Sequence, residues 1–126
     1  MRKAINPPNA PSAIGTYNQG IETNGLVFTS GQVGIDSSTG QMVGGGIDMQ
    51  AAQALKNIEA ILSSVDIGKD SIAKLTVFVK NLDDFQSVNK AFENFFNGID
   101  YPVRSTVEVS ELPMGALIEI ECIAIK

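Results

Sequence analysis

The chain has 126 residues, with 14 acidic and 9 basic side chains, a formal net charge of −5 and no histidine or tryptophan. This length suits one domain, and we predict a single domain over residues 1–126. Without histidine, Ser-His-Asp triads, Cys-His dyads and histidine-containing zinc sites are excluded, so any chemistry must use carboxylates, Arg, Lys, Tyr, hydroxyls or the backbone. The acidic balance and the scattered basic residues also argue against a nucleic-acid partner.

The first predicted element is a hairpin. Asn24-Gly25 is a type I′ turn signal, so the segment around residues 16–23 is predicted to pair with a short strand at 26–29. A further short strand at residues 2–5 would extend the same sheet. The glycine-rich stretch 40–46 follows and is interpreted as a loop, because it lacks the Lys-Ser or Lys-Thr pair of a phosphate-binding loop.

Two amphipathic helices come next. Apolar residues recur at three- and four-residue steps over 49–65, with Asp48 as the predicted N-cap. The second helix is predicted to begin after Asn81, whose side chain can cap it. Each helix is expected to run for about four turns and to bury one stripe. The stripes comprise Ala52, Leu55, Ile58, Leu62 and Val65 in the first helix, and Phe85, Val88, Phe92 and Phe95 in the second.

Three later segments, 72–80, 103–109 and 117–125, alternate in the manner of β-strands. We therefore predict an α+β fold, a single-domain five- or six-stranded mixed sheet with two helices on one face. Two helices can cover only one face of the sheet, so the apolar residues of the other face must be buried by something else. Self-association with another subunit is the simplest way to bury them. That second face is expected to carry Phe78, Ile123 and Ile125.

Arg104 is the most informative residue. It is one of only two arginines, and it lies in mid-strand, where its forked donors would match a carboxylate. Two interpretations stay open: a cation that binds a ligand, or a structural ion pair with Glu108, Glu119 or Glu121 on the same sheet face. Glu119 and Glu121 lie one pleat period apart on one side of their strand. Glu119 can therefore act as a base toward a water or be a solvated strand residue.

Four other positions and the single cysteine carry weaker signals. Tyr17, near the hairpin, can present its ring and hydroxyl to a ligand or serve as a turn aromatic. Ser30-Gly31 ends a strand, where N–H groups can meet an anion or form a plain turn. Spacing alone argues nothing for Asn89. Cys122 is predicted to be a buried small hydrophobe, and as a lone cysteine it can build neither a disulfide nor a thiolate metal cluster.

No apolar run reaches the ~18 residues of a membrane span, and residues 1–15 lack the apolar stretch of a secretory signal. The composition therefore predicts a cytoplasmic protein with no membrane association and no metal.

Spaced motifs cover essentially the whole chain. Ala-Pro-Ser-Ala-Ile-Gly-Thr-Tyr-Asn-Gln-Gly (10–20) and Val-Phe-Thr-Ser-Gly-Gln-Val (27–33) are followed by Tyr-Pro-Val-Arg-Ser-Thr-Val-Glu-Val (101–109) and Leu-Ile-Glu-Ile-Glu-Cys-Ile-Ala (117–124). Together they resemble the RidA-type (YjgF-like) reactive-intermediate deaminases. The resemblance implies a chorismate mutase-like homotrimer with a ligand cleft at each interface and no cofactor. It also implies hydrolysis of 2-imino and enamine acids, such as 2-aminoacrylate/2-iminopropanoate and 2-iminobutanoate, to 2-oxo acids and ammonia.

The resemblance assigns roles to individual residues as well. Arg104 would clamp the substrate carboxylate, Glu119 would hold the attacking water, and the backbone around Thr106 would receive the imine nitrogen. Many relatives have cysteine where Thr106 stands, so this chain lacks any thiol role there. The residues expected to line the cleft are Tyr17, Ser30, Gly31 and Asn89.

Two other functions compete with the deaminase. One is a regulatory module that binds a small 2-oxo or amino acid without turnover. The other is a ribonuclease, a role attached to relatives, which the charge of −5 and the absence of histidine disfavour.

Overall fold

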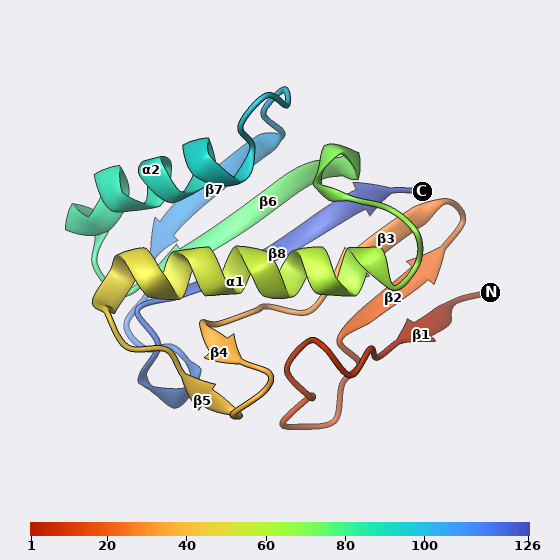
Figure 1. Ribbon diagram of the computed structural model, residues 1–126, viewed down its shortest axis with the longest axis horizontal. Coiled ribbons are helices and arrows are strands. Elements are labelled where there is room, and N and C mark those ends of the chain that lie inside the picture. Colours follow the sequence, from red (N-terminus) through yellow and green to blue (C-terminus); the bar gives the residue numbers. More distant parts are fainter.

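The computed structural model describes all 126 residues and has two layers (Figure 1). One layer is a six-stranded mixed sheet in the order β1-β2-β3-β8-β6-β7. The other consists of α1 (Gly46–Ser63) and α2 (Phe85–Phe95), which both cover the same face of the sheet. The sheet strands are Lys3–Ile5 (β1), Gly20–Thr23 (β2), Leu26–Thr29 (β3), Ile72–Val79 (β6), Val103–Glu108 (β7) and Ile118–Ile125 (β8). The predicted α+β class, the mixed sheet and the one-sided helices are confirmed.

The strand connections follow the sequence signals closely. β2 and β3 form the predicted hairpin, and Asn24 and Gly25 at its turn have φ of 49° and 77°, as a type I′ turn requires. The extra strand β1 is present and pairs with β2. β6 and β7 are the one parallel pair, and α2 is the crossover between them. A small hairpin of Ile35–Asp36 (β4) and Gln41–Met42 (β5) was not predicted, because its two-residue strands are too short to show alternation.

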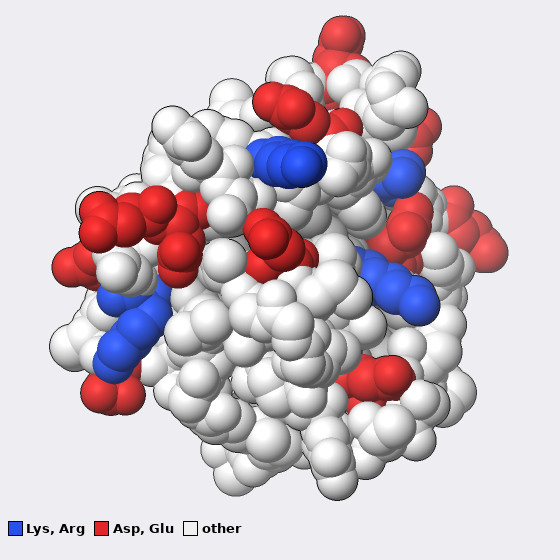
Figure 2. Space-filling view, turned by 60° about the vertical axis from the view of Figure 1, so that its left-hand side comes forward, with Lys and Arg blue, Asp and Glu red and all other residues white.

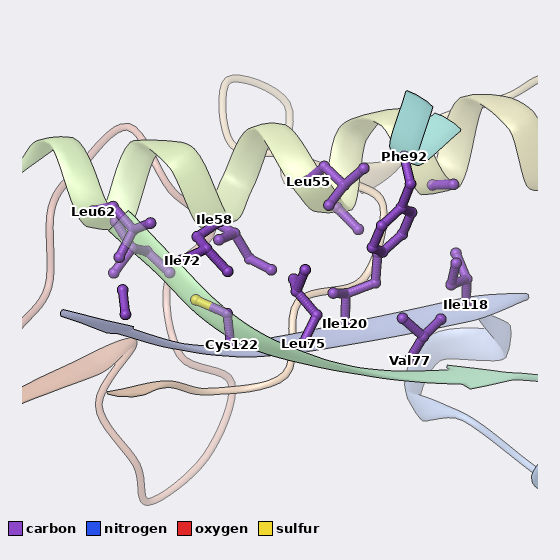
Figure 3. Close-up of a cluster of buried hydrophobic side chains, with 14 of the residues drawn as sticks. Leu55, Ile58, Leu62, Ile72, Leu75, Val77, Phe92, Ile118, Ile120 and Cys122 are labelled. Atoms are coloured by element: carbon purple, nitrogen blue, oxygen red, sulfur yellow. The ribbon is translucent and has the colours of Figure 1, made fainter. Parts of the chain in front are cut away.

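The core lies between the helices and the centre of the sheet (Figure 3). Leu55, Ile58 and Leu62 of α1 pack onto side chains that β6 and β8 turn toward them. Cys122 is 3% exposed, as predicted, and burial raises the pKa of its thiol to about 12. The side chains contributed by the sheet include Leu75, Val77, Ile118, Ile120 and Cys122. Neither helix is long and apolar enough to cross a bilayer.

Helix α1 differs from its prediction at the N-terminus. Gly45, with φ of 101°, occupies the N-cap position, so Asp48 lies within the first turn and does not cap the helix. The helix has 18 residues, about five turns, and ends at Ser63. Ala52 is exposed, whereas Ala51 is buried. The stripe is otherwise confirmed within the helix, because the remaining predicted residues up to Leu62 are buried.

Helix α2 begins at Phe85, three residues later than predicted, and is shorter than predicted. The Asn81 side chain accepts a 2.9 Å hydrogen bond from the Asp83 N–H and caps a 3-10 turn that leads into the helix. The helix has 11 residues, about three turns. Val88 and Phe92 are buried, but Phe85 is 41% exposed, which corrects its assignment to the buried stripe.

In strand β7 the polar residues face the helices and the apolar residues face away, which is the reverse of what its alternation suggests. Arg104 pairs with Leu75 and Thr106 pairs with Val77, so both lie on the face that the helices cover. Its apolar residues Val103 and Val107 are 66% and 43% exposed on the other face. β7 is at the edge of the sheet, so the helices shield its inner face from solvent only in part.

Strand β8 places its carboxylates on the open face of the sheet. Glu119 pairs with Phe78 and Glu121 with Thr76, opposite in direction to the buried residues of both strands. The expectation that Arg104 shares a face with Glu119 and Glu121 is therefore wrong. The open face also carries exposed or half-buried apolar residues: Leu26, Phe28, Phe78, Val103, Val107, Ile123 and Ile125.

Candidate functional site

Arg104 lies beneath α2 and is held by side chains of that helix. Its Nη2 donates a 2.6 Å hydrogen bond to Asn89 Oδ1. Its guanidinium carbon lies 4.8 Å from the centre of the Phe92 ring and 5.3 Å from that of Phe85, over both rings. α2 and β7 are thus joined by a cation that is partly buried.

No carboxylate of the chain forms an ion pair with Arg104. Glu108 shares its sheet face, but Glu108 Oε1 accepts a 2.9 Å hydrogen bond from the Leu82 N–H, and Glu119 and Glu121 lie on the opposite face. The ion-pair interpretation is therefore wrong within the chain. Desolvation lowers the pKa of Arg104, and no ion pair offsets that cost. A positioned guanidinium with unused donors favours binding of an external anion.

A cavity of about 300 Å³ opens beside this guanidinium. Arg104 is singled out by the sequence and Asn89 only by the family resemblance, whereas Glu93, Tyr101 and Pro102 were not named as site residues. Glu93 follows Asn89 by four residues on the same helix face, and the Tyr-Pro pair immediately precedes β7, so both signals were present in the sequence. The cavity walls are Asn89, Phe92, Glu93, Tyr101, Pro102 and Arg104.

Thr106 lies two residues beyond Arg104 on the same face of β7. Its Oγ1 is buried and has no hydrogen-bond partner. A buried hydroxyl without a partner is unfavourable, and no contact in the chain explains it.

Glu119 lies on the open face of the sheet, and its side chain packs closely against Gly31. A Cβ atom added to Gly31 would lie 2.5 Å from Glu119 Oε2, so the carboxylate occupies space that any other residue would fill. The loop is fixed here because Gln32 and Ile120 exchange backbone hydrogen bonds of 2.7 and 2.9 Å. Burial raises the pKa of Glu119, and the nearby Glu121 shifts it in the same direction. A carboxylate with a raised pKa is a better general base once ionised.

Tyr17 and Ser30 lie near Glu119. Tyr17 and Gly31 line a small cavity of about 60 Å³ together with Glu119. The Tyr17 hydroxyl accepts a 3.2 Å hydrogen bond from the Ile14 N–H. Ser30 Oγ donates a 2.6 Å hydrogen bond to the Asn18 carbonyl, so its hydroxyl already fixes the neighbouring loop.

The candidate residues therefore form two groups. The Arg104 cluster comprises Arg104, Asn89 and Thr106, and the Glu119 cluster comprises Tyr17, Ser30, Gly31 and Glu119. Arg104 pairs with Leu75 of β6 and Glu119 with Phe78 of the same strand, which puts their Cα atoms roughly 14 Å apart, on opposite sheet faces. One small ligand cannot touch both clusters of a single chain.

Comparison with known proteins gives close matches over the full length. The family model described as "Endoribonuclease L-PSP" matches residues 7–126. A Salmonella typhimurium protein named 2-iminobutanoate/2-iminopropanoate deaminase is 44% identical, with the alignment covering 100% of this chain and 99% of that protein. Among solved structures, a Yersinia pestis protein of the conserved Rid family, described as of unknown function, has a TM-score of 0.97 at 46% identity over 100% of both chains. Escherichia coli TdcF with bound serine has a TM-score of 0.94 at 38% identity over 98% of each chain.

Proposed function

Because this chain belongs to the Endoribonuclease L-PSP family and to its RidA-type proteins, we propose that it is a 2-iminobutanoate/2-iminopropanoate deaminase. One observation carries the proposal: the guanidinium of Arg104 is partly buried, positioned and without a carboxylate partner beside a cavity. That arrangement suits the carboxylate of a small 2-imino acid. The proposed reaction needs no cofactor and takes place in the cytoplasm.

The two clusters form one site if two copies of the chain meet. The open sheet face carries the Glu119 cluster and an apolar surface that a second copy would cover. We therefore place the Arg104 cluster of one copy opposite the Glu119 cluster of the next, in a homotrimer with three equivalent clefts. The number three rests on the family resemblance.

The proposed mechanism uses one residue from each side of the cleft. Arg104 pairs with the substrate carboxylate and fixes C2 of the imine. Glu119 takes a proton from a water whose oxygen bonds to C2 and passes that proton to the imine nitrogen, which gives the neutral carbinolamine. The C2–N bond then breaks: the hydroxyl proton is transferred to the nitrogen, ammonia leaves with the electron pair of that bond, and the 2-oxo acid remains. Positioning of the reactants adds to the contribution of the base, and the two together can suffice because imines already hydrolyse in water.

The direct test measures 2-oxo acid formed from an imino acid that is generated enzymatically in the assay. Arg104→Ala is expected to lower kcat/KM by about 10- to 100-fold, because a charge-assisted hydrogen bond contributes ~1.5–3 kcal/mol. Arg2→Ala changes the only other arginine, which is exposed, and should leave the rate unchanged. Equal rates for wild type and Arg104→Ala would remove Arg104 from the mechanism.

The shared cleft has its own test. Arg104→Ala and Glu119→Gln each leave one cluster intact, so refolding an equal mixture should restore about a quarter of the sites. Activity above that of both parent variants is the expected result. No recovery, in a mixture that has exchanged subunits, would contradict a site shared between copies.

The serine bound in the TdcF structure favours a second candidate function, a module that binds a small amino or 2-oxo acid without turnover. Calorimetric titration with a 2-oxo acid separates the two. Tight binding without acceleration of imine hydrolysis would favour the regulatory module.

The family description also names a ribonuclease activity, which the charge of this chain disfavours. On the face shown in Figure 2, Lys and Arg side chains stand apart, with acidic and uncharged residues between them. An RNA backbone is normally bound by clustered basic residues. Salt-dependent RNA binding by the purified protein would revive this activity.

A further inference from the structure

Three residues of α2 that contact Arg104 lie on one stripe of the helix. Phe85, Asn89 and Phe92 are separated by four and three residues, so they follow one another along the side that faces β7. Phe85 is 41% exposed and stands outside the buried core cluster, so core packing does not account for it. Its ring contact with the Arg104 guanidinium does.

A guanidinium has two kinds of surface. Its flat faces attract aromatic rings, and its edge carries five N–H donors that bind carboxylates in bidentate fashion. Here the phenylalanine rings lie against the cation while Asn89 Oδ1 takes a hydrogen bond from Nη2. The side chain is therefore held in one arrangement with donors left over. Less conformational freedom is lost when an anion then binds.

We propose that Asn89, Phe85 and Phe92 act through Arg104 as positioning residues that aim its free N–H edge at the substrate carboxylate. The kinetic part of this inference rests on the proposed deaminase function. It changes the role of Asn89, which the family resemblance places in the cleft lining: here its oxygen is occupied by Arg104. It also adds Phe85 and Phe92 to the residues that determine substrate affinity.

The neutral charge of Asn89 matters in this arrangement. An aspartate at this position has the same shape and could accept the same hydrogen bond, but it would pair with the cation and compete with the substrate carboxylate. Asn89→Asp should therefore bind anions more weakly than Asn89→Ala. A role limited to accepting a hydrogen bond predicts the reverse order, because aspartate keeps the acceptor and alanine removes it.

A spectroscopic experiment reads the position of Arg104 without using activity. With only Arg2 and Arg104 in the chain, the ¹⁵N-resolved spectrum of arginine Nε–H groups holds two signals. The Arg104 signal should be displaced by the ring currents of Phe85 and Phe92, and Phe85→Leu should move it toward the Arg2 signal. Phe95→Leu is the matched control, because that ring contacts Lys69 instead. An Arg104 signal that Phe85→Leu does not move would overturn the proposal.

Binding measurements complete the test. The Kd for pyruvate, a 2-oxo acid product, should rise about 3- to 10-fold in Phe85→Leu and Asn89→Ala, and further in Asn89→Asp, while kcat at saturation changes little. Asn89→Asp binding as tightly as wild type would sink the proposal. If wild type shows no turnover but the signal shift and the order of Kd values hold, the deaminase assignment fails and the positioning role stands.

Discussion

The Arg104 cluster and the Glu119 cluster are built in opposite ways. Arg104 is held by contacts with side chains of α2, namely two phenylalanine rings and one amide. Glu119, in contrast, fits against the backbone because residue 31 is a glycine without a side chain. Burial disfavours the charge in both, lowering the pKa of Arg104 and raising that of Glu119. Neither charge has a partner in its own cluster. Each cluster therefore presents the charge that the other lacks, as two halves of one polar cleft would.

Removing the base from the Glu119 cluster should have the largest effect. Glu119→Gln is expected to lower kcat by about 10²- to 10⁴-fold, the usual contribution of a general base. In wild type the rate should fall as pH drops through the pKa of Glu119, which lies above its ordinary value of 4.5, because the protonated carboxyl cannot accept the proton of water. Rate–pH profiles check this. An acid limb that persists in Glu119→Gln would assign it to another group.

Filling the space at Gly31 should come next. Gly31→Ala places a Cβ 2.5 Å from Glu119 Oε2, so the carboxylate must move, and a misplacement of about 1 Å can cost ~100-fold in rate. Gly44→Ala is the control, since that glycine has open space around it. Turnover and thermal unfolding are measured for both variants. Full activity in Gly31→Ala would show that the position of the carboxylate is not critical.

The same carboxylate should affect stability in a pH-dependent way. Because the folded pKa of Glu119 is raised, its protonated form favours the folded state, and that contribution is lost as pH rises through the folded pKa. Glu119→Gln should therefore be more stable than wild type at about pH 7, and the difference should disappear near pH 4. Denaturant unfolding at both pH values tests this, with Glu59→Gln on α1 as control. A difference that grows toward low pH would contradict the sign.

The smallest predicted effect concerns Thr106 in the Arg104 cluster. Thr106→Val removes a buried hydroxyl that has no partner, so the free energy of unfolding should rise by about 1 kcal/mol. Activity should persist, because the backbone at this position is proposed to meet the imine nitrogen. Ser105→Ala, at the exposed neighbour, is the control. Loss of activity with unchanged stability would assign the hydroxyl to the reaction.

Most of the fold could be predicted because its signals are local. The Asn24-Gly25 turn, the Asn81 cap and the alternation in β6 and β8 each depend on residues close together in the chain. The start of α1 was missed because glycines at 45 and 46 adopt positive φ and leave Asp48 inside the helix. The β4–β5 hairpin was missed because its strands have two residues each.

The site was harder to predict, because alternation separates two faces without saying which one the helices cover. In β7 the valines point away from the core, and Arg104 and Thr106 point toward α2. The contact between Arg104 and Asn89 spans 15 residues and depends on how α2 lies over β7, which no sequence window contains. The seating of Glu119 against Gly31 is likewise a tertiary contact.

Each of the two tyrosines of the chain lies beside one of the two clusters. Tyr17 lines the small cavity with Glu119, Tyr101 lines the cavity beside Arg104, and there is no tryptophan to mask them. Near-ultraviolet absorbance and emission therefore come mainly from these two phenols. Replacing either one with phenylalanine would leave a protein whose intrinsic fluorescence reports on one of the two clusters alone, with no dye attached.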